Sequence, residues 1–214
     1  DPFFKMLNRS LSNFMNAMTG HDYTFYPFST TNNKDFENLR DIYFDACFNP
    51  LLSSQDFHQE GWRLENEDPN NKETPITFKG VVYNEMKGQF SNASYLFYIN
   101  FLNKIYPSLH ILGGDPQAIT NLSYEDLVDF HASRYHPSNA KIFSYGDLPL
   151  SENLEFLNKN LGHFGKRAKK QSRLDIKEPI DLSKSQEVFV EGPVDPTLSE
   201  DKQYKASMTW FVGK

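Results

Sequence analysis

The chain has 214 residues, of which 38% are hydrophobic, 23% are charged and 15% are aromatic. This length is enough for one large domain, or for one domain and the beginning of a second. The content of hydrophobic and aromatic residues argues against disorder. The net charge of −6 argues against a basic nucleic-acid-binding protein, the single Cys47 excludes an internal disulfide, and no run of 18 apolar residues predicts a membrane-spanning helix.

The first 50 residues predict two helices with a strand between them. Apolar side chains in the first 18 positions recur at helical spacing, and the helix that they predict ends near Gly20. Residues 22–30 are aromatic and β-branched, which predicts a strand with Pro27 at an edge or a bend. Residues 33–48 show an amphipathic helical pattern that would bury Phe36, Leu39, Tyr43 and Phe44.

The middle of the chain is predicted to be mostly helical. Residues 53–65 predict a helix with a serine cap, and residues 66–73 form a polar loop. The apolar stretch 78–90 predicts a helix, and a further helical pattern reaches Ile105. Residues 113–116 (Gly-Gly-Asp-Pro) predict a turn.

The last third of the chain combines helices with candidate strands. Ser123 and Asp126 have the spacing of a capping box, with Asp in place of the usual Glu or Gln, and predict a helix that ends before Pro137. A second helix is predicted over residues 154–164. The candidate strands are residues 141–145, 186–190 and 206–212.

This order of elements is typical of an α+β fold and lacks the regular alternation of a doubly wound sheet. Five basic residues between positions 165 and 173 indicate a linker, and we place a domain boundary near residues 165–185. We therefore expect residues 1–170 to form most of one domain, and residues 171–214 to form a linker and the start of a second.

Glu85 is the candidate residue with the least obvious role, because it lies among apolar residues. It is either a solvated helix glutamate paired with a nearby lysine, or a carboxylate that needs a cation, since burying an unpaired charge costs several kcal/mol. A metal would satisfy it, but no histidine pair lies close by. His131 and His136 are five residues apart, which turns them about 140° from each other on a helix, so they fail as an on-helix zinc pair.

Other chemistries find less support. Cys47 lies between two apolar residues on the apolar side of its predicted helix, which is typical of a buried structural thiol. The chain has no G-x-S-x-G elbow, and its glycine pair lacks the spacing of a phosphate loop. The basic residues between 166 and 173 could bind phosphate, but a solvated linker explains them more simply.

Four motifs in order carry a resemblance to a known family. They are residues 1–11 (DPFFKMLNRSL), 16–19 (NAMT), 78–88 (FKGVVYNEMKG) and 135–140 (YHPSNA). Together they resemble the presequence protease branch of the pitrilysin-type inverted zincins. The resemblance covers nearly the whole chain and would make it an interior segment of the family's N-terminal half. It implies an antiparallel β-sheet covered by helices.

The resemblance also implies a metal site. Members of this family bind Zn²⁺ through two histidines of an H-x-x-E-H helix, whose glutamate is the general base, and through one distal glutamate. By motif match the distal ligand is Glu85, and the H-x-x-E-H helix would precede Asp1. The implied reaction is attack of zinc-assisted water on a peptide carbonyl. With one ligand of three and without the base, this chain alone is expected to be inactive.

Substrate-binding residues follow from the same match. Asn16, Ala17, Met18 and Thr19 correspond to the family's strand beside the cleft, to which a peptide adds as an extra strand through main-chain hydrogen bonds. Phe3 and Phe4 would line an apolar specificity pocket or belong to the ordinary core. Many relatives carry a second glutamate where this chain has Phe78, so the match gives no supporting carboxylate at that position.

The resemblance implies a mitochondrial enzyme, in the matrix or the intermembrane space, that degrades cleaved presequences and other short unfolded peptides. It would act as a monomer or weak homodimer, without nucleic acid or membrane as a partner. Two alternatives stay open. One is a non-catalytic relative that keeps the fold and has lost the metal residues, although Glu85 favours the enzyme. The other is an unrelated α+β interaction domain.

Overall fold

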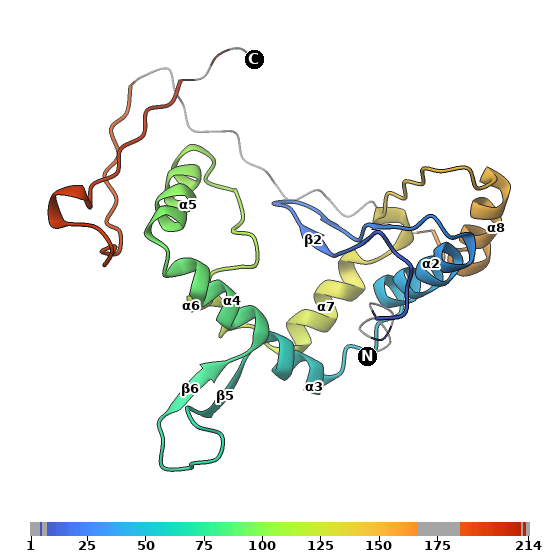
Figure 1. The fold of residues 1–214 in the computed structure, drawn as a ribbon, viewed down its shortest axis with the longest axis horizontal. Helices are drawn as coiled ribbons and strands as arrows, with labels where there is room; N and C mark the ends of the chain where they lie inside the picture. The colour runs from blue at the N-terminus through green and yellow to red at the C-terminus, as the bar shows by residue number, and fades with distance from the viewer. Residues whose placement is uncertain (1–4, 6–7, 167–184, 211, 213–214) are drawn as a thin grey trace. The chain divides into compact units, whose positions relative to one another are not determined.

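The computed structural model describes residues 5, 8–166, 185–210 and 212 of the chain (Figure 1). The chain divides into two compact units. The first unit comprises Asp1–Ser54 and Ser123–Ser172, and the second comprises Gln55–Leu122 and Arg173–Lys214. The described residues contain helices and three two-stranded antiparallel ladders, so the predicted α+β class is confirmed.

The first unit begins with an antiparallel hairpin. Its strands are β1 (Phe14–Met15), β2 (Met18–Thr19), β3 (Thr24–Phe25) and β4 (Phe28–Ser29). β1 pairs with β4 and β2 pairs with β3 in one continuous register, because Met15 lies opposite Phe28 and Met18 lies opposite Phe25. The strand predicted over residues 22–30 is therefore confirmed in two short parts, β3 and β4, with an interruption at Tyr26 and Pro27.

The helix predicted to continue to Gly20 is wrong for residues 8–20: residues 8–13 are not helical, and residues 14–19 form strands or lie between them. The apolar residues there match helical spacing, but their backbone pairs with residues 24–29, and a local pattern cannot reveal a strand partner. The turn closes through a hydrogen bond of 2.7 Å from the Gly20 N–H to the Tyr23 carbonyl. A Cβ at Gly20 would overlap the ring of Tyr23, which is exposed and would have to move aside.

Helix α2 (Asn33–Phe48) has the predicted bounds and supplies most of the core of the first unit. The Asn32 side chain caps it by accepting a hydrogen bond of 2.9 Å from the Asp35 N–H. Leu39 is fully buried and Tyr43 is 4% exposed, and the predicted core residues Phe36 and Phe44 are half-buried. Aromatic contacts join α2 to the hairpin and to helix α8 (Leu150–Leu161), through the pairs Phe28–Tyr43 and Phe44–Phe156.

Helices α7 (Tyr124–Arg134) and α8 (Leu150–Leu161) complete the first unit, with the short 3₁₀ turn η2 (Pro137–Asn139) between them. The capping box is confirmed: the Ser123 N–H donates to the Asp126 carboxylate at 2.8 Å, and the Asp126 N–H donates to the Ser123 hydroxyl at 3.1 Å. Helix α8 begins four residues before the predicted helix does, because Pro149 can precede its first turn.

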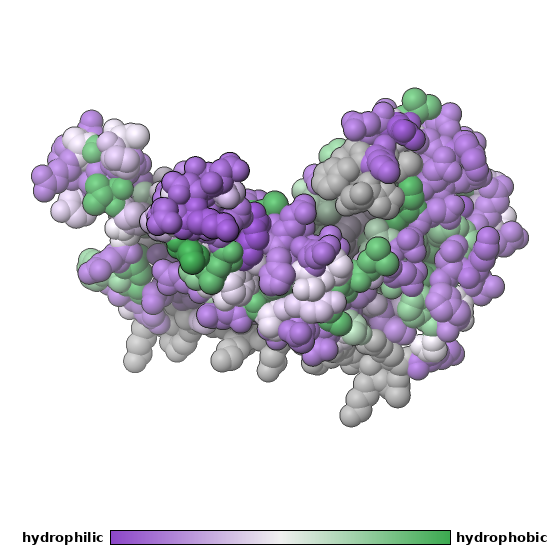
Figure 2. All heavy atoms as spheres, turned by 90° about the horizontal axis from the view of Figure 1, so that it is seen from below, coloured by the Kyte–Doolittle hydropathy of each residue, from purple (hydrophilic) through white to green (hydrophobic). Residues whose placement is uncertain are grey.

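The strand predicted over residues 141–145 is wrong for the part of the chain that the structure describes. These residues are extended and join no ladder, and Phe143 and Tyr145 are 90% and 93% exposed. Their β-type composition is real, but a strand also needs a neighbour to pair with. Figure 2 shows a mostly hydrophilic face with scattered hydrophobic side chains.

The second unit is built around a hairpin and two consecutive helices. Its hairpin joins β5 (Arg63–Asn66) to β6 (Ile76–Lys79), with Leu64 opposite Phe78. The helix predicted over residues 53–65 is thus only partly right. α3 (Ser54–Asp56) and the π-turn η1 (Phe57–Gly61) are helical, but the chain then pairs with β6. The remaining elements are α4 (Val81–Phe90), α5 (Ala93–Ile105), α6 (Pro116–Ile119) and the 3₁₀ turn η3 (Glu200–Lys202).

The last segment differs from its prediction. Within residues 185–210 and 212 the structure has η3 and no strand, so the strands predicted over residues 186–190 and 206–212 are wrong for this part of the chain. Most of the predicted linker lies outside the described residues. The domain boundary predicted near residues 165–185 stays a prediction. In the described part of the chain, no helix is both long enough and apolar enough to cross a membrane.

Candidate functional site

Glu85 lies on α4, and a glycine at the start of that helix fixes its position. Gly80 links β6 to α4 with φ of +153°, a conformation that favours glycine. A Cβ at Gly80 would also overlap the backbone carbonyl of Gly61. Met86, the residue after Glu85 and about 100° from it around the helix, is only 1% exposed and anchors the buried side of α4. The sequence signal for this geometry is the glycine between the strand and the helix.

The Glu85 side chain is exposed and makes one weak contact. The Gln89 amide donates to the Glu85 carboxylate at 3.4 Å, from the next turn of the helix. The salt bridges among the described residues join Lys34 to Glu37 and Arg63 to Glu65, so the lysine partner considered for Glu85 is not seen there. No group of three His, Cys, Asp or Glu residues that could hold a metal occurs in the described part of the chain.

The exposed Glu85 carboxylate is available to a metal ion. Its oxygens are not occupied by a cation within the described residues, and zinc accepts carboxylate oxygen beside histidine nitrogen. A solvated surface glutamate would look the same. The assignment of Glu85 as a ligand therefore stays a prediction that depends on two histidines from outside these 214 residues.

Phe78 belongs to an aromatic cluster. Its ring lies 5.8 Å from the ring of Trp62 and 5.8 Å from that of Tyr83. The Trp62 indole N–H in turn donates to the Leu122 carbonyl at 2.8 Å. The position thus contributes apolar packing between β6 and its neighbours, and it offers no carboxylate near Glu85.

The predicted peptide-binding residues lie on the hairpin of the first unit. Met18 and Thr19 form β2, Asn16 and Ala17 lie between β1 and β2, and all four residues are exposed. Phe3 and Phe4, predicted for the same role, lie outside the described residues. The structure therefore describes a strand for one half of the predicted binding segment and a short interruption for the other half.

The hydrogen-bond pattern of the hairpin decides which main-chain groups face outward. The Asn16 N–H donates to the Pro27 carbonyl at 3.1 Å, and the Gly20 N–H donates to Tyr23 in the same way. In an antiparallel pair, alternate residues face the partner strand, so Ala17 and Thr19 face the outer edge. The Ala17 N–H is taken by the Asn16 side-chain oxygen at 2.9 Å. The outer edge thus presents the Ala17 carbonyl and both polar groups of Thr19.

The histidines and the cysteine of the first unit have structural contacts. The His131 ring donates from Nε2 to the Cys47 carbonyl at 2.8 Å, because a carbonyl can only accept, and it stacks on the Tyr135 ring. His136 precedes η2 and its Nδ1 lies 2.8 Å from the Ser138 hydroxyl. Burial raises the pKa of the Cys47 thiol to about 11, which suits the predicted structural thiol and argues against a nucleophile.

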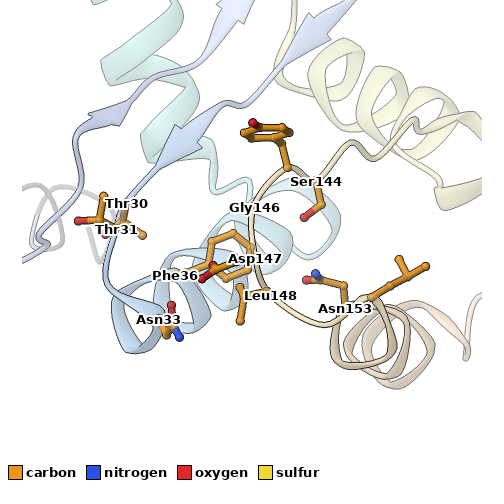
Figure 3. Close-up of a pocket in the computed structure, with 11 residues that line it drawn as sticks. Thr30, Thr31, Asn33, Phe36, Ser144, Gly146, Asp147, Leu148 and Asn153 are labelled. Carbon is orange, nitrogen blue, oxygen red and sulfur yellow. The ribbon is translucent and has the colours of Figure 1, made fainter.

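A cavity of about 280 Å³ lies in the first unit, and sequence reasoning did not find it. It opens between the start of α2, residues 144–148 and the start of α8 (Figure 3). Asp147 is the one carboxylate in its lining, which otherwise holds neutral side chains. Asn153, at its edge, accepts a hydrogen bond of 2.7 Å from Arg40, whose guanidinium lies 3.9 Å from the Phe156 ring centre. The residues that line the cavity include no pair of groups suited to acid–base catalysis.

Known proteins match the whole chain. The family model described as "Peptidase M16 inactive domain" matches residues 121–213. The mitochondrial presequence protease of Kluyveromyces lactis is 59% identical over 214 residues, which are 100% of this chain and 22% of the relative. The Saccharomyces cerevisiae protein of that name is 59% identical over 213 residues, 100% of this chain and 21% of the relative.

A more distant relative gives the same result. The mitochondrial presequence protease of Candida albicans is 56% identical over 218 residues, 100% of this chain and 21% of the relative. The chain therefore spans about a fifth of the length of the relatives that it matches. These matches confirm the resemblance drawn from the four motifs: along its entire length, the chain is similar in sequence to mitochondrial presequence proteases.

Proposed function

We propose that this chain is part of a zinc metallopeptidase that degrades cleaved mitochondrial presequences and other short unfolded peptides. The observation that carries the proposal is the 59% identity to mitochondrial presequence proteases over the full length of the chain. Such identity, without gaps in coverage, supports a shared activity in the whole protein and a mitochondrial location.

Glu85 would supply one ligand to the zinc ion in this enzyme. Its exposed carboxylate has no cation partner among the described residues, and Gly80 and Met86 hold its helix in place. The two histidines and the general base would come from an H-x-x-E-H helix outside these 214 residues. Bound zinc would polarise the peptide carbonyl and lower the pKa of its water. Without those partners, the chain alone would be inactive.

The hairpin would bind the substrate as an added strand. The outer edge presents the Ala17 carbonyl and both main-chain groups of Thr19, while the side chains of Asn16 and Met18 are exposed beside it. Main-chain hydrogen bonds do not depend on side-chain identity, which suits an enzyme that degrades unrelated peptides. Nucleic acid and membrane have no place in this proposal, and the protein would act as a monomer or weak homodimer.

The test is to measure zinc content and presequence hydrolysis in the full-length protein and in its Glu85→Gln variant. Loss of an outer residue that only orients a ligand costs roughly 10–100-fold in metal affinity or activity, and loss of a direct ligand should cost more. The matched control is Glu125→Gln, which removes an equally exposed helix carboxylate from α7. If Glu85→Gln keeps both its zinc and its activity, the ligand assignment is wrong.

One observation favours a second candidate, a non-catalytic relative. The family model that matches residues 121–213 describes an inactive domain, so this part of the chain would have a structural or substrate-binding role in either case. The two candidates differ in the metal. A full-length protein that contains no zinc and leaves presequence peptides intact would support the non-catalytic role.

A further inference from the structure

The hairpin that carries the predicted binding residues has a defect in its centre. Asn16 and Pro27 face each other in the position of a hydrogen-bonded pair, in which each residue would donate to the other. Proline has no N–H, so the pair has only the bond from the Asn16 N–H to the Pro27 carbonyl. The Asn16 carbonyl therefore lacks its ladder donor immediately before Ala17.

Tyr43, from the middle of α2, places a hydroxyl at this defect. Its oxygen lies 3.5 Å from the Asn16 carbonyl and 3.4 Å from the Pro27 carbonyl, which is long for an O–H···O hydrogen bond. Burial raises the pKa of the Tyr43 hydroxyl, so it stays protonated and able to donate. The ring is fixed as well, because it lies 4.8 Å from the ring of Phe28.

A pair of tyrosines, Tyr26 and Tyr135, holds the opposite strand. The registers on both sides put Tyr26 opposite Ala17, and its hydroxyl lies 2.6 Å from the hydroxyl of Tyr135 at the end of α7. Burial, followed by this hydrogen bond, raises the pKa of Tyr26, so its hydroxyl stays protonated at neutral pH. Tyr135 stacks on His131, which donates to the Cys47 carbonyl of α2.

These contacts connect three elements around the defect: α2 contacts the hairpin, the hairpin contacts α7, and α7 contacts α2. We propose that Tyr26, Tyr43 and Tyr135 are positioning residues for the peptide-binding edge. They hold the backbone at Asn16 and Ala17 so that the outer groups of Ala17 and Thr19 stay aligned for an incoming strand. The inference rests on the proposed function, since it concerns the same edge.

Loss of a positioning hydroxyl should weaken substrate binding and spare the chemical step. If the strand edge is not held in place, it must become ordered when the peptide binds. The conformational entropy lost in this ordering makes the binding free energy less favourable and lowers the affinity. None of the three tyrosines is proposed to touch the metal or the reacting carbonyl. The expected signature is therefore a higher KM with kcat little changed.

The experiment uses the full-length protein and a presequence peptide, with kcat and KM measured for Tyr26→Phe, Tyr135→Phe and the double variant. Each single change removes one side of the same hydrogen bond and should raise KM by about 3- to 10-fold, with kcat within about twofold of the wild type. Because both changes break one bond, the double variant should show the same KM as either single variant. Tyr43→Phe should raise KM by less, because its contacts are longer.

Tyr135→Phe is the decisive variant because Tyr135 is not part of the hairpin. Its matched control is Tyr124→Phe, at the other end of α7, where the lost hydroxyl donates to the Leu52 carbonyl at 2.7 Å. That control should lower the melting temperature to a similar extent and leave KM unchanged. If Tyr26→Phe fails to fold, Tyr135→Phe still tests the proposal.

The results of these experiments distinguish the proposed peptidase function from the positioning role of the tyrosines. If the wild-type protein does not cleave the peptide, the proposed function is wrong and the positioning role is lost with it. If the wild type is active but Tyr135→Phe has the KM of the wild type, the positioning role alone is overturned. Additive effects of the two changes, or an equal rise of KM in Tyr124→Phe, would also contradict it.

Discussion

The two regions that carry the predicted site residues are stabilised in opposite ways. Helix α4 depends on backbone geometry: Gly80 begins it in a conformation that favours glycine, and no side chain caps it. The hairpin depends on side chains, because Pro27 breaks its ladder and tyrosine hydroxyls lie at the break. The helix presents a carboxylate, whereas the hairpin presents main-chain groups. A substitution that forces a different backbone conformation should therefore destabilise α4. The removal of a tyrosine hydroxyl should destabilise the hairpin.

The largest effect is expected from Gly80→Ala. The new Cβ would overlap the Gly61 carbonyl, and alanine is strained at φ of +153°, so we expect a loss of about 3 kcal/mol in the free energy of unfolding. Hydrogen exchange of the full-length protein should show lost protection over residues 78–90 and unchanged protection over the hairpin.

Gly88→Ala is the matched control on the same helix. A Cβ there meets nothing within 4 Å, so alanine should stabilise α4 by about 0.5–1 kcal/mol through its better helix propensity. Equal damage from both substitutions would show that α4 does not depend on the geometry at Gly80.

The same contrast explains how much of the fold could be predicted from the sequence. The bounds of α2 and the capping box of α7 were predicted correctly, because periodicity and caps are signals within a few residues. Residues 14–19 and 62–65 were assigned to helices and are strands or adjoin them, because pairing with residues 24–29 and 76–79 decides their structure. The prediction for residues 141–145 is wrong in the opposite sense. Their composition is typical of a strand, but they have no neighbouring strand to pair with in the described part of the chain.

The residues of the candidate site also differ in how far the sequence could reveal them. Glu85 and residues 16–19 were found only through the resemblance, since spacing alone left Glu85 open between a solvated residue and a ligand. The tyrosines around the hairpin were missed because their contacts join distant positions. Tyr26 and Tyr135 are 109 residues apart, and Tyr43 is 27 residues from Asn16. No periodicity within a short window reports such a pair.

A smaller effect is expected from Ser123→Ala, which removes the side-chain cap of the helix that carries Tyr135. Loss of a serine cap costs about 1 kcal/mol, because the N–H of Asp126 loses its acceptor. The effect on KM should be weak, since Tyr135 lies at the far end of α7. Thermal unfolding and peptide kinetics of the full-length variant would measure both. A rise of KM as large as that of Tyr135→Phe would show that the whole helix, and not the hydroxyl, positions the hairpin.

The smallest effect is a difference in pH dependence between the starts of α7 and α4. Hydrogen bonds from the Ser123 backbone and side chain hold the pKa of Asp126 below its usual value. A carboxyl with a lowered folded pKa contributes stability above its unfolded pKa of about 3.9, and that contribution is lost as the pH falls through the folded pKa. Acid should therefore reduce hydrogen-exchange protection at residues 124–127, after correction for intrinsic exchange rates. Residues 81–84 should not respond in this way, because α4 begins at Gly80 without a side-chain cap. Asp126→Asn should abolish the difference, and a pH response of equal size at both helix starts would show that it does not arise from the capping box.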